Sequence, residues 1–283
     1  INNHPTKGYF DDEIKQLPIP PNFKVFPRQN QFEDTLQSIL NDLDSRGARI
    51  APTFAFIDPF GFKGIPFQLV RRLLANPKTE VFITVMIDSI NRWLENPSAQ
   101  ITNHITKLFG TDEVLGIVRS SGNRVCELRN LYQHQLKNCA EFVRYFEMRD
   151  ASDRPIYYLF FATNNSLGHR KMKEAFWKVD TSTGFKFSDA TDPNQPVLFE
   201  EDHTLELAKE LASRFIGRKV DVKTIKKYIE DDTAFIDSHM KKALRYLERQ
   251  GEINVEAYKA DGMKRKGNSF PDEVIVSFSS VPF

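Results

Sequence analysis

The residues best suited to chemistry are Asp58, Pro59 and Phe60, which follow a short apolar run over residues 53–57. A short polar residue, a proline and an aromatic residue in this order are typical of enzymes that methylate an amine. In those enzymes the polar side chain and a backbone carbonyl accept hydrogen bonds from the amine, while the aromatic ring stacks on a planar base. The usual form has a second proline before the aromatic residue, which this sequence lacks. The alternative is a strand that ends in an Asp cap followed by ordinary turn residues.

The elements around this turn indicate a parallel α/β sheet. In chain order they are a strand over 22–28, a helix over 31–46, a strand over 53–57, a helix over 66–74 and a strand over 80–87. The run over 53–57 is unbroken by polar residues and is predicted to be buried on both faces. Alternation of strand and helix is typical of crossover units, whose ligands bind outside the carboxyl ends of the strands. We therefore predict a Rossmann-like, mostly parallel α/β domain over residues 1–180.

Two further polar residues follow predicted strands. Asp88 ends the strand over 80–87 and is either a second carboxylate at the same sheet edge or a helix cap. His169 follows a predicted strand over 156–162 and is either an acid–base group or a solvated side chain.

The bulk composition bears on partners, metal binding and cellular location. A net charge of +1 gives no overall electrostatic preference for nucleic acid or membrane, so any such preference must come from local segregation of charge. No apolar run approaches the roughly 20 residues that span a bilayer, and no signal-peptide pattern is present, so no membrane contact is predicted. Cys126 and Cys139 form no metal or redox motif, and no metal site is predicted. A reducing, cytoplasmic setting is the simplest interpretation.

The C-terminal part follows a different plan. Residues 181–201 are polar, contain Pro193 and Pro196, and are predicted to be a linker. After it, helices are predicted over 203–215, 222–230 and 234–249, and antiparallel strands over 253–258 and 274–278. Three helices followed by a β-hairpin with a basic tip predict a winged helix-turn-helix domain over residues 202–283.

The third of these helices has a basic face, which predicts a nucleic-acid interface. Lys241, Lys242, Arg245 and Arg249 lie opposite its apolar stripe, where a recognition helix meets phosphates and base edges. The hairpin loop would add Lys264, Arg265 and Lys266 as the wing. The alternative is a solvated helix in a protein-binding module, since residues 202–283 hold 15 Lys and Arg against 14 Asp and Glu.

Four segments together resemble the three-Cys-motif partner proteins. They cover residues 55–61 (Ala-Phe-Ile-Asp-Pro-Phe-Gly), 64–66 (Gly-Ile-Pro), 157–163 (Tyr-Tyr-Leu-Phe-Phe-Ala-Thr) and 167–168 (Leu-Gly). The trailing helices and hairpin are similar to the winged helix attached to many members of that family. The resemblance implies a methyltransferase-like Rossmann domain and, as partner, a three-Cys-motif protein encoded nearby.

The resemblance also implies S-adenosylmethionine as cofactor. The family carries a glycine-rich first turn of the type Asp-x-Phe-Ala-Gly-x-Gly, to which nothing in this sequence corresponds. Either this turn precedes Ile1 or the domain does not bind the cofactor. By position in such a fold, Asn2 or Asn3 would contact the ribose hydroxyls, and Asn30 and Gln31 would lie near the adenine.

Two hypotheses follow from the sequence. The first is an S-adenosylmethionine-dependent, methyltransferase-like protein acting on or bound to DNA or RNA, in which Asp58 and Pro59 position the acceptor and Phe60 stacks on it. The second is a non-catalytic module that keeps a Rossmann-like scaffold and binds DNA or a partner protein.

Overall fold

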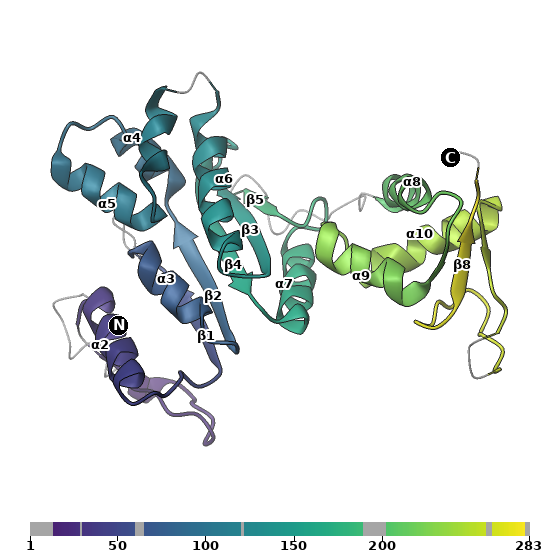
Figure 1. Cartoon of the computed structure of the whole chain (residues 1–283), viewed down its shortest axis with the longest axis horizontal. Coiled ribbons are helices and arrows are strands. Elements are labelled where there is room, and N and C mark those ends of the chain that lie inside the picture. Colours follow the sequence, from purple (N-terminus) through teal and green to yellow (C-terminus); the bar gives the residue numbers. More distant parts are fainter. Residues whose placement is uncertain are drawn as a thin grey trace.

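The computed structural model describes residues 14–28, 30–59, 65–119, 122–188, 202–258 and 262–280. Within them the chain forms a five-stranded α/β part and, beyond residue 202, a smaller part of three helices and three short strands (Figure 1). No helix in these ranges combines the length and the hydropathy needed to cross a membrane.

The large sheet has one reversed strand. Its strands are β1 (Thr53–Ile57), β2 (Thr79–Val85), β3 (Phe142–Arg149), β4 (Pro155–Thr163) and β5 (Lys186–Ser188), in the order β1-β2-β4-β3-β5. β1 pairs in parallel with β2, and β3 pairs in parallel with β5, whereas β4 is antiparallel to both of its neighbours. The other four strands therefore share one direction, which confirms the predicted mostly parallel α/β fold.

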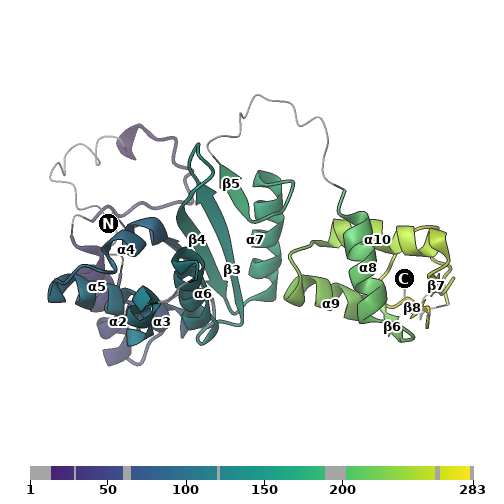
Figure 2. The ribbon, with the colours of Figure 1, turned by 90° about the horizontal axis from the view of Figure 1, so that it is seen from above.

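Helices cover both faces of this sheet. They are α2 (Phe32–Ser45), α3 (Phe67–Leu74), α4 (Ile87–Trp93), α5 (Ala99–Phe109), a 3-10 helix (Asp112–Arg119), α6 (Arg124–Lys137) and α7 (Ser166–Val179). The larger hydrophobic cluster packs α3, α4, α5 and α6 against one face of the sheet. On the other face, Phe82 and Phe161 of the sheet pack with Phe176 of α7. Figure 2 shows α7 on the side opposite α3 and α6.

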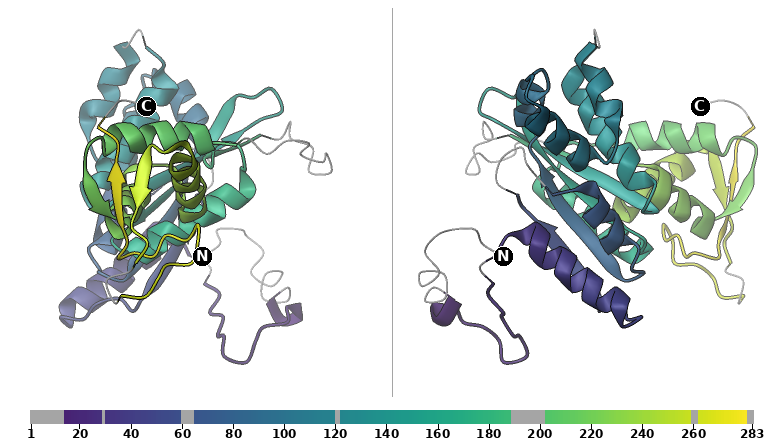
Figure 3. Two further views of the ribbon diagram at one scale, coloured as in Figure 1. Left: turned by 90° about the vertical axis from the view of Figure 1, so that its right-hand side faces the viewer. Right: turned by 60° about the vertical axis from the view of Figure 1, so that its left-hand side comes forward.

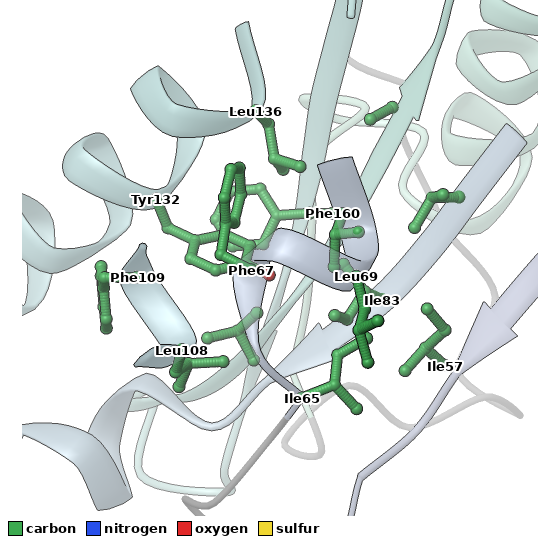
Figure 4. Close-up of a cluster of buried hydrophobic side chains, with 14 of the residues drawn as sticks. Ile57, Ile65, Phe67, Leu69, Ile83, Leu108, Phe109, Tyr132, Leu136 and Phe160 are labelled. Atoms are coloured by element: carbon green, nitrogen blue, oxygen red, sulfur yellow. The ribbon is translucent and has the colours of Figure 1, made fainter. Parts of the chain in front are cut away.

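The larger cluster is built around the ring of Tyr132 from α6 (Figure 4). Its ring centroid lies 5.0 Å from that of Phe160, 5.6 Å from Phe109 and 5.8 Å from Phe67. The contacts with Phe109 and Phe67 are edge-to-face, the geometry that aromatic quadrupoles favour. Side chains from α3, α5, α6 and β4 are thereby held together, which fixes the layer of helices against the sheet.

Two predictions about the first strands are wrong. β1 is an edge strand that pairs, among the described residues, with β2 alone, and its Phe54 and Phe56 are 54% and 57% exposed rather than buried. An apolar run does not distinguish an edge strand from a central one, because burial depends on what pairs with it. The segment 22–28 is exposed and forms no strand, since alternating apolar residues give no ladder without a partner strand.

The smaller part contains the predicted three helices. The helices are α8 (Thr204–Arg214), α9 (Val222–Asp232) and α10 (Asp237–Gln250), and the strands are β6 (Lys219–Asp221), β7 (Ile253–Val255) and β8 (Ile275–Phe278). The strands form an antiparallel sheet in the order β6-β8-β7. One hydrophobic cluster joins the helices to this sheet. The left view of Figure 3 shows the strands of this sheet beside the helices. This is the arrangement of a winged helix-turn-helix.

Candidate nucleic-acid interface

The amphipathic pattern of α10 fixes which face it presents to solvent. Met240, Ala243, Leu244 and Leu247 are fully buried against the core of the smaller part. This spacing follows the helical period, so the residues between them must point outward. The helix ends at Gly251, whose φ of +75° is a left-handed conformation that glycine adopts without steric cost.

The outward face of α10 carries the predicted basic residues. Lys242 and Arg249 are exposed, and Arg245 is partly exposed. The Nε of Arg245 donates to the backbone carbonyl of Asn268, 3.1 Å away in the hairpin loop. Lys241 forms an ion pair with Asp237 one turn earlier. The structure thus leaves Lys242 and Arg249 most available to a ligand, while Arg245 also joins the helix to the loop.

The hairpin loop has two exposed lysines and one arginine with a structural contact. Lys264 and Lys266 are exposed. Arg265 is mostly buried, pairs with Glu248 of α10 and lies over the ring of Phe270. Arg265 therefore holds the loop on α10, and the two flanking lysines are the groups that face solvent.

A buried lysine of α7 joins the large sheet to the winged helix. The Nζ of Lys173 donates to the carbonyls of Ile229 at 2.7 Å, Thr233 at 2.9 Å and Glu230 at 3.2 Å. These carbonyls lie at the end of α9, where a helix leaves acceptors unpaired and favours positive charge. Lys173 is only 4% exposed, and this burial, together with nearby Arg144, lowers its pKa to about 7.

Three further side chains strengthen this contact. Arg144 of β3 donates from Nη2 to the carbonyl of Thr233 at 2.5 Å and from Nε to His169 at 2.9 Å. Trp177 of α7 donates from Nε1 to the carbonyl of Ala234 at 2.8 Å. The turn between α9 and α10 is therefore held by donors from both α7 and β3.

His169 is neither solvated nor placed for acid–base chemistry. It is buried in α7, its ring stacks on Phe142 with centroids 4.6 Å apart, and its Nε2 accepts the hydrogen bond from Arg144. Burial and the adjacent Arg144 and Lys173 lower its pKa to about 3, so the ring is neutral near pH 7. Sequence reasoning missed this cluster. The spacing of His169, Lys173 and Phe176 is the signal that could have shown that they share one buried helix face, although it gives no indication of their partners.

The Asp58 turn lies at the carboxyl end of β1. Asp58 is exposed and Pro59 is partly exposed, whereas Phe60 is outside the described residues. Asp88 lies in the first turn of α4, where its carboxylate pairs with Arg92 at 3.2 Å.

Two of the four predicted cofactor residues lie within the part of the chain that the structure describes. Asn30 and Gln31 are exposed at the start of α2, and Asn2 and Asn3 lie outside the described residues. Over the ranges that the structure describes, no hydrogen bond or ion pair joins Asn30 or Gln31 to Asp58.

The C-terminal fold and its basic helix define a winged helix-turn-helix domain. Comparison with protein families supports this class, because residues 186–259 match the GMT-like wHTH domain. No curated protein and no solved structure gave a match to the chain. The resemblance to the three-Cys-motif partner proteins stays a prediction.

Proposed function

We propose that the chain binds double-stranded DNA through α10 and the hairpin loop after β7. The observation that carries the proposal is the exposed basic face of α10 within a domain that matches a winged helix-turn-helix family. In such domains the recognition helix enters the major groove, which is wide enough in B-form DNA to admit an α-helix. The deep, narrow major groove of an RNA duplex is too narrow to admit a helix, which favours DNA over duplex RNA.

Some of the basic residues are available to contact phosphates, and another holds the hairpin loop in place. Lys242 and Arg249 on the helix and Lys264 and Lys266 on the loop are exposed, so each can displace a counterion from the DNA backbone. Arg265 supports them by fixing the loop. The near-zero net charge of the chain makes binding depend on this local cluster.

The test titrates a fluorescent DNA duplex with the full chain. Binding is measured by fluorescence anisotropy at a series of salt concentrations. In the Lys242→Ala, Arg249→Ala double variant, the slope of log K against log salt should fall in magnitude by about two. Lys209→Ala is the matched control, because Lys209 is an exposed lysine on α8. Equal slopes for the wild type and the double variant would refute DNA binding by this face.

Methyl transfer is a second candidate function, supported by the position of Asp58 and Pro59. Both follow β1 at its carboxyl end, the edge at which α/β sheets bind ligands. In this reading Asp58 accepts a hydrogen bond from the target amine and S-adenosylmethionine is the methyl donor. Calorimetric titration with S-adenosylmethionine tests it. Heat that is lost in the Asn30→Ala, Gln31→Ala variant would support the predicted adenine contact, and no binding by the wild type would remove the candidate.

A further inference from the structure

A cleft lies where α7 meets the winged helix. Its volume is about 480 Å³, within the range of pockets that hold small ligands. Lys178 and Thr181 line it from the end of α7, and Ser238 and Lys242 line it from α10. Figure 2 shows α7 beside the helices of the winged helix in this region.

The charges of the cleft favour an anionic ligand. Lys178 and Lys242 are exposed, and among the described residues neither has a carboxylate within ion-pair distance. Two carboxylates also line the cleft. Glu174 is neutralised by its ion pair with Lys171 at 2.8 Å, whereas Asp202 keeps its negative charge, because the backbone N–H of Thr204 that it accepts at 3.0 Å is neutral. Lys178 and Lys242 outnumber this one remaining carboxylate, so the net charge of the cleft is positive.

The helices that carry the two lysines are held against each other before any ligand binds. Lys178 and Trp177 belong to the last turns of α7, the helix whose Lys173 is held by the end of α9. The ring of Trp177 packs on that of His239, in the first turn of α10, with centroids 4.4 Å apart. Because these contacts hold α7 against α10, the two helices need not rearrange when a ligand bridges Lys178 and Lys242.

The cleft is continuous with the proposed DNA-binding face. Ser238, Lys242, Arg245 and Arg249 follow one another at helical spacing along the outer side of α10, and the first two also line the cleft. A DNA backbone that lies along this side of α10 would pass Lys178 as it leaves the helix. The charge of the cleft suits any anionic ligand, and its continuity with this face favours DNA over an acidic peptide.

We propose that the cleft binds the sugar-phosphate backbone of DNA, so that Lys178 of the large α/β part contacts a phosphate beside the one held by Lys242. The hydroxyl groups of Ser238 and Thr181 are exposed and can donate to phosphate oxygens. This inference rests on the proposed function and extends it, because it makes the α/β part a component of the DNA interface.

The test compares Lys178→Ala with wild type in the full chain, using anisotropy of a labelled duplex across a salt series. Loss of one phosphate contact should weaken binding roughly eightfold at about 0.1 M salt and lower the magnitude of the salt slope by about one. Lys137→Ala is the matched control, since Lys137 is an exposed lysine of α6 on the opposite face of the sheet and should change neither quantity. Lys178 is exposed, so its removal should leave thermal unfolding unchanged.

The outcomes separate this inference from the proposed function. If Lys178→Ala binds like wild type while the Lys242→Ala, Arg249→Ala variant is weakened, the inference fails and the proposed function stands. If the wild type does not bind DNA at all, both fail. If Lys178→Ala weakens the binding of poly-glutamate but leaves the binding of DNA unchanged, the cleft belongs to a protein partner and the inference is overturned.

Discussion

Replacing the buried Lys173 with methionine tests the contact between α7 and α9. Methionine keeps the apolar stem but removes the ammonium group that donates to three carbonyls near the end of α9. In the folded protein the pKa of Lys173 is lowered from 10.5 to about 7. Between these values the unfolded chain binds a proton that the folded chain does not, so the free energy of unfolding of the wild type rises with pH.

The size of this effect follows from the two pKa values. Each pH unit between them adds about 1.4 kcal/mol, and less close to pH 7, where the folded-state amine is half protonated. Integration from about pH 7 to about pH 9 gives a gain of about 2 kcal/mol. Because methionine does not titrate, the Lys173→Met variant lacks this gain. The stability difference between wild type and variant should therefore shift by that amount in favour of wild type.

The assay is urea unfolding at both pH values, followed by tryptophan fluorescence, since Trp177 lies in the contact being tested. Taking the difference between wild type and variant cancels the titration of all other groups. Lys171→Met is the matched control, because the Lys171 side chain is on the same helix and 64% exposed. An equal difference at the two pH values would show that folded Lys173 keeps its proton, and the argument from burial would be refuted.

Three further substitutions can be tested by urea unfolding. Gly184→Ala should lose about 2–4 kcal/mol, because Gly184 has a φ of +72° and an added Cβ would lie 2.5 Å from the Trp177 ring; an unchanged stability would contradict this packing. The pKa of His169 is about 3 in the folded protein against 6.5 in the unfolded chain, so the unfolded chain binds the proton more tightly. Through this group the free energy of unfolding of the wild type should fall by about 2 kcal/mol between about pH 6.5 and 4.5, and His169→Gln should not share this loss. Asp221→Ala should cost about 1 kcal/mol, because the Asp221 carboxylate caps α9 by accepting the N–H of Thr224 at 2.8 Å, and a change within the error of the measurement would argue against the cap.

The helices of the winged helix could be predicted because their signals are local. In α10 the buried residues from Met240 to Leu247 recur at helical spacing, and Gly251 marks the end of the helix. The three-residue strands β5 and β6 could not be predicted, since three residues are too few to show a period of two. β5 falls within the segment that was expected to be a linker.

The contact between the two parts could not be predicted because it pairs side chains with distant backbone. Lys173 donates to a carbonyl 56 residues away and Arg144 to one 89 residues away. Backbone acceptors carry no sequence signature, so a lysine on the inner face of a helix gives no indication of its partner. The basic residues of α10 were identifiable by type and spacing, but the support role of Arg265 depends on Glu248, which only the folded loop brings close.

The placement of Trp177 has a consequence for how this protein can be divided. Its ring belongs to the same hydrophobic cluster as the core of the winged helix, and lies 6.2 Å from the ring of Phe235 between centroids. A fragment that begins at Asp202 would lack this ring and the donors that satisfy the end of α9. We expect such a fragment to be less stable than the same residues in the full chain, so that transplanting the winged helix into another protein would require α7 to accompany it.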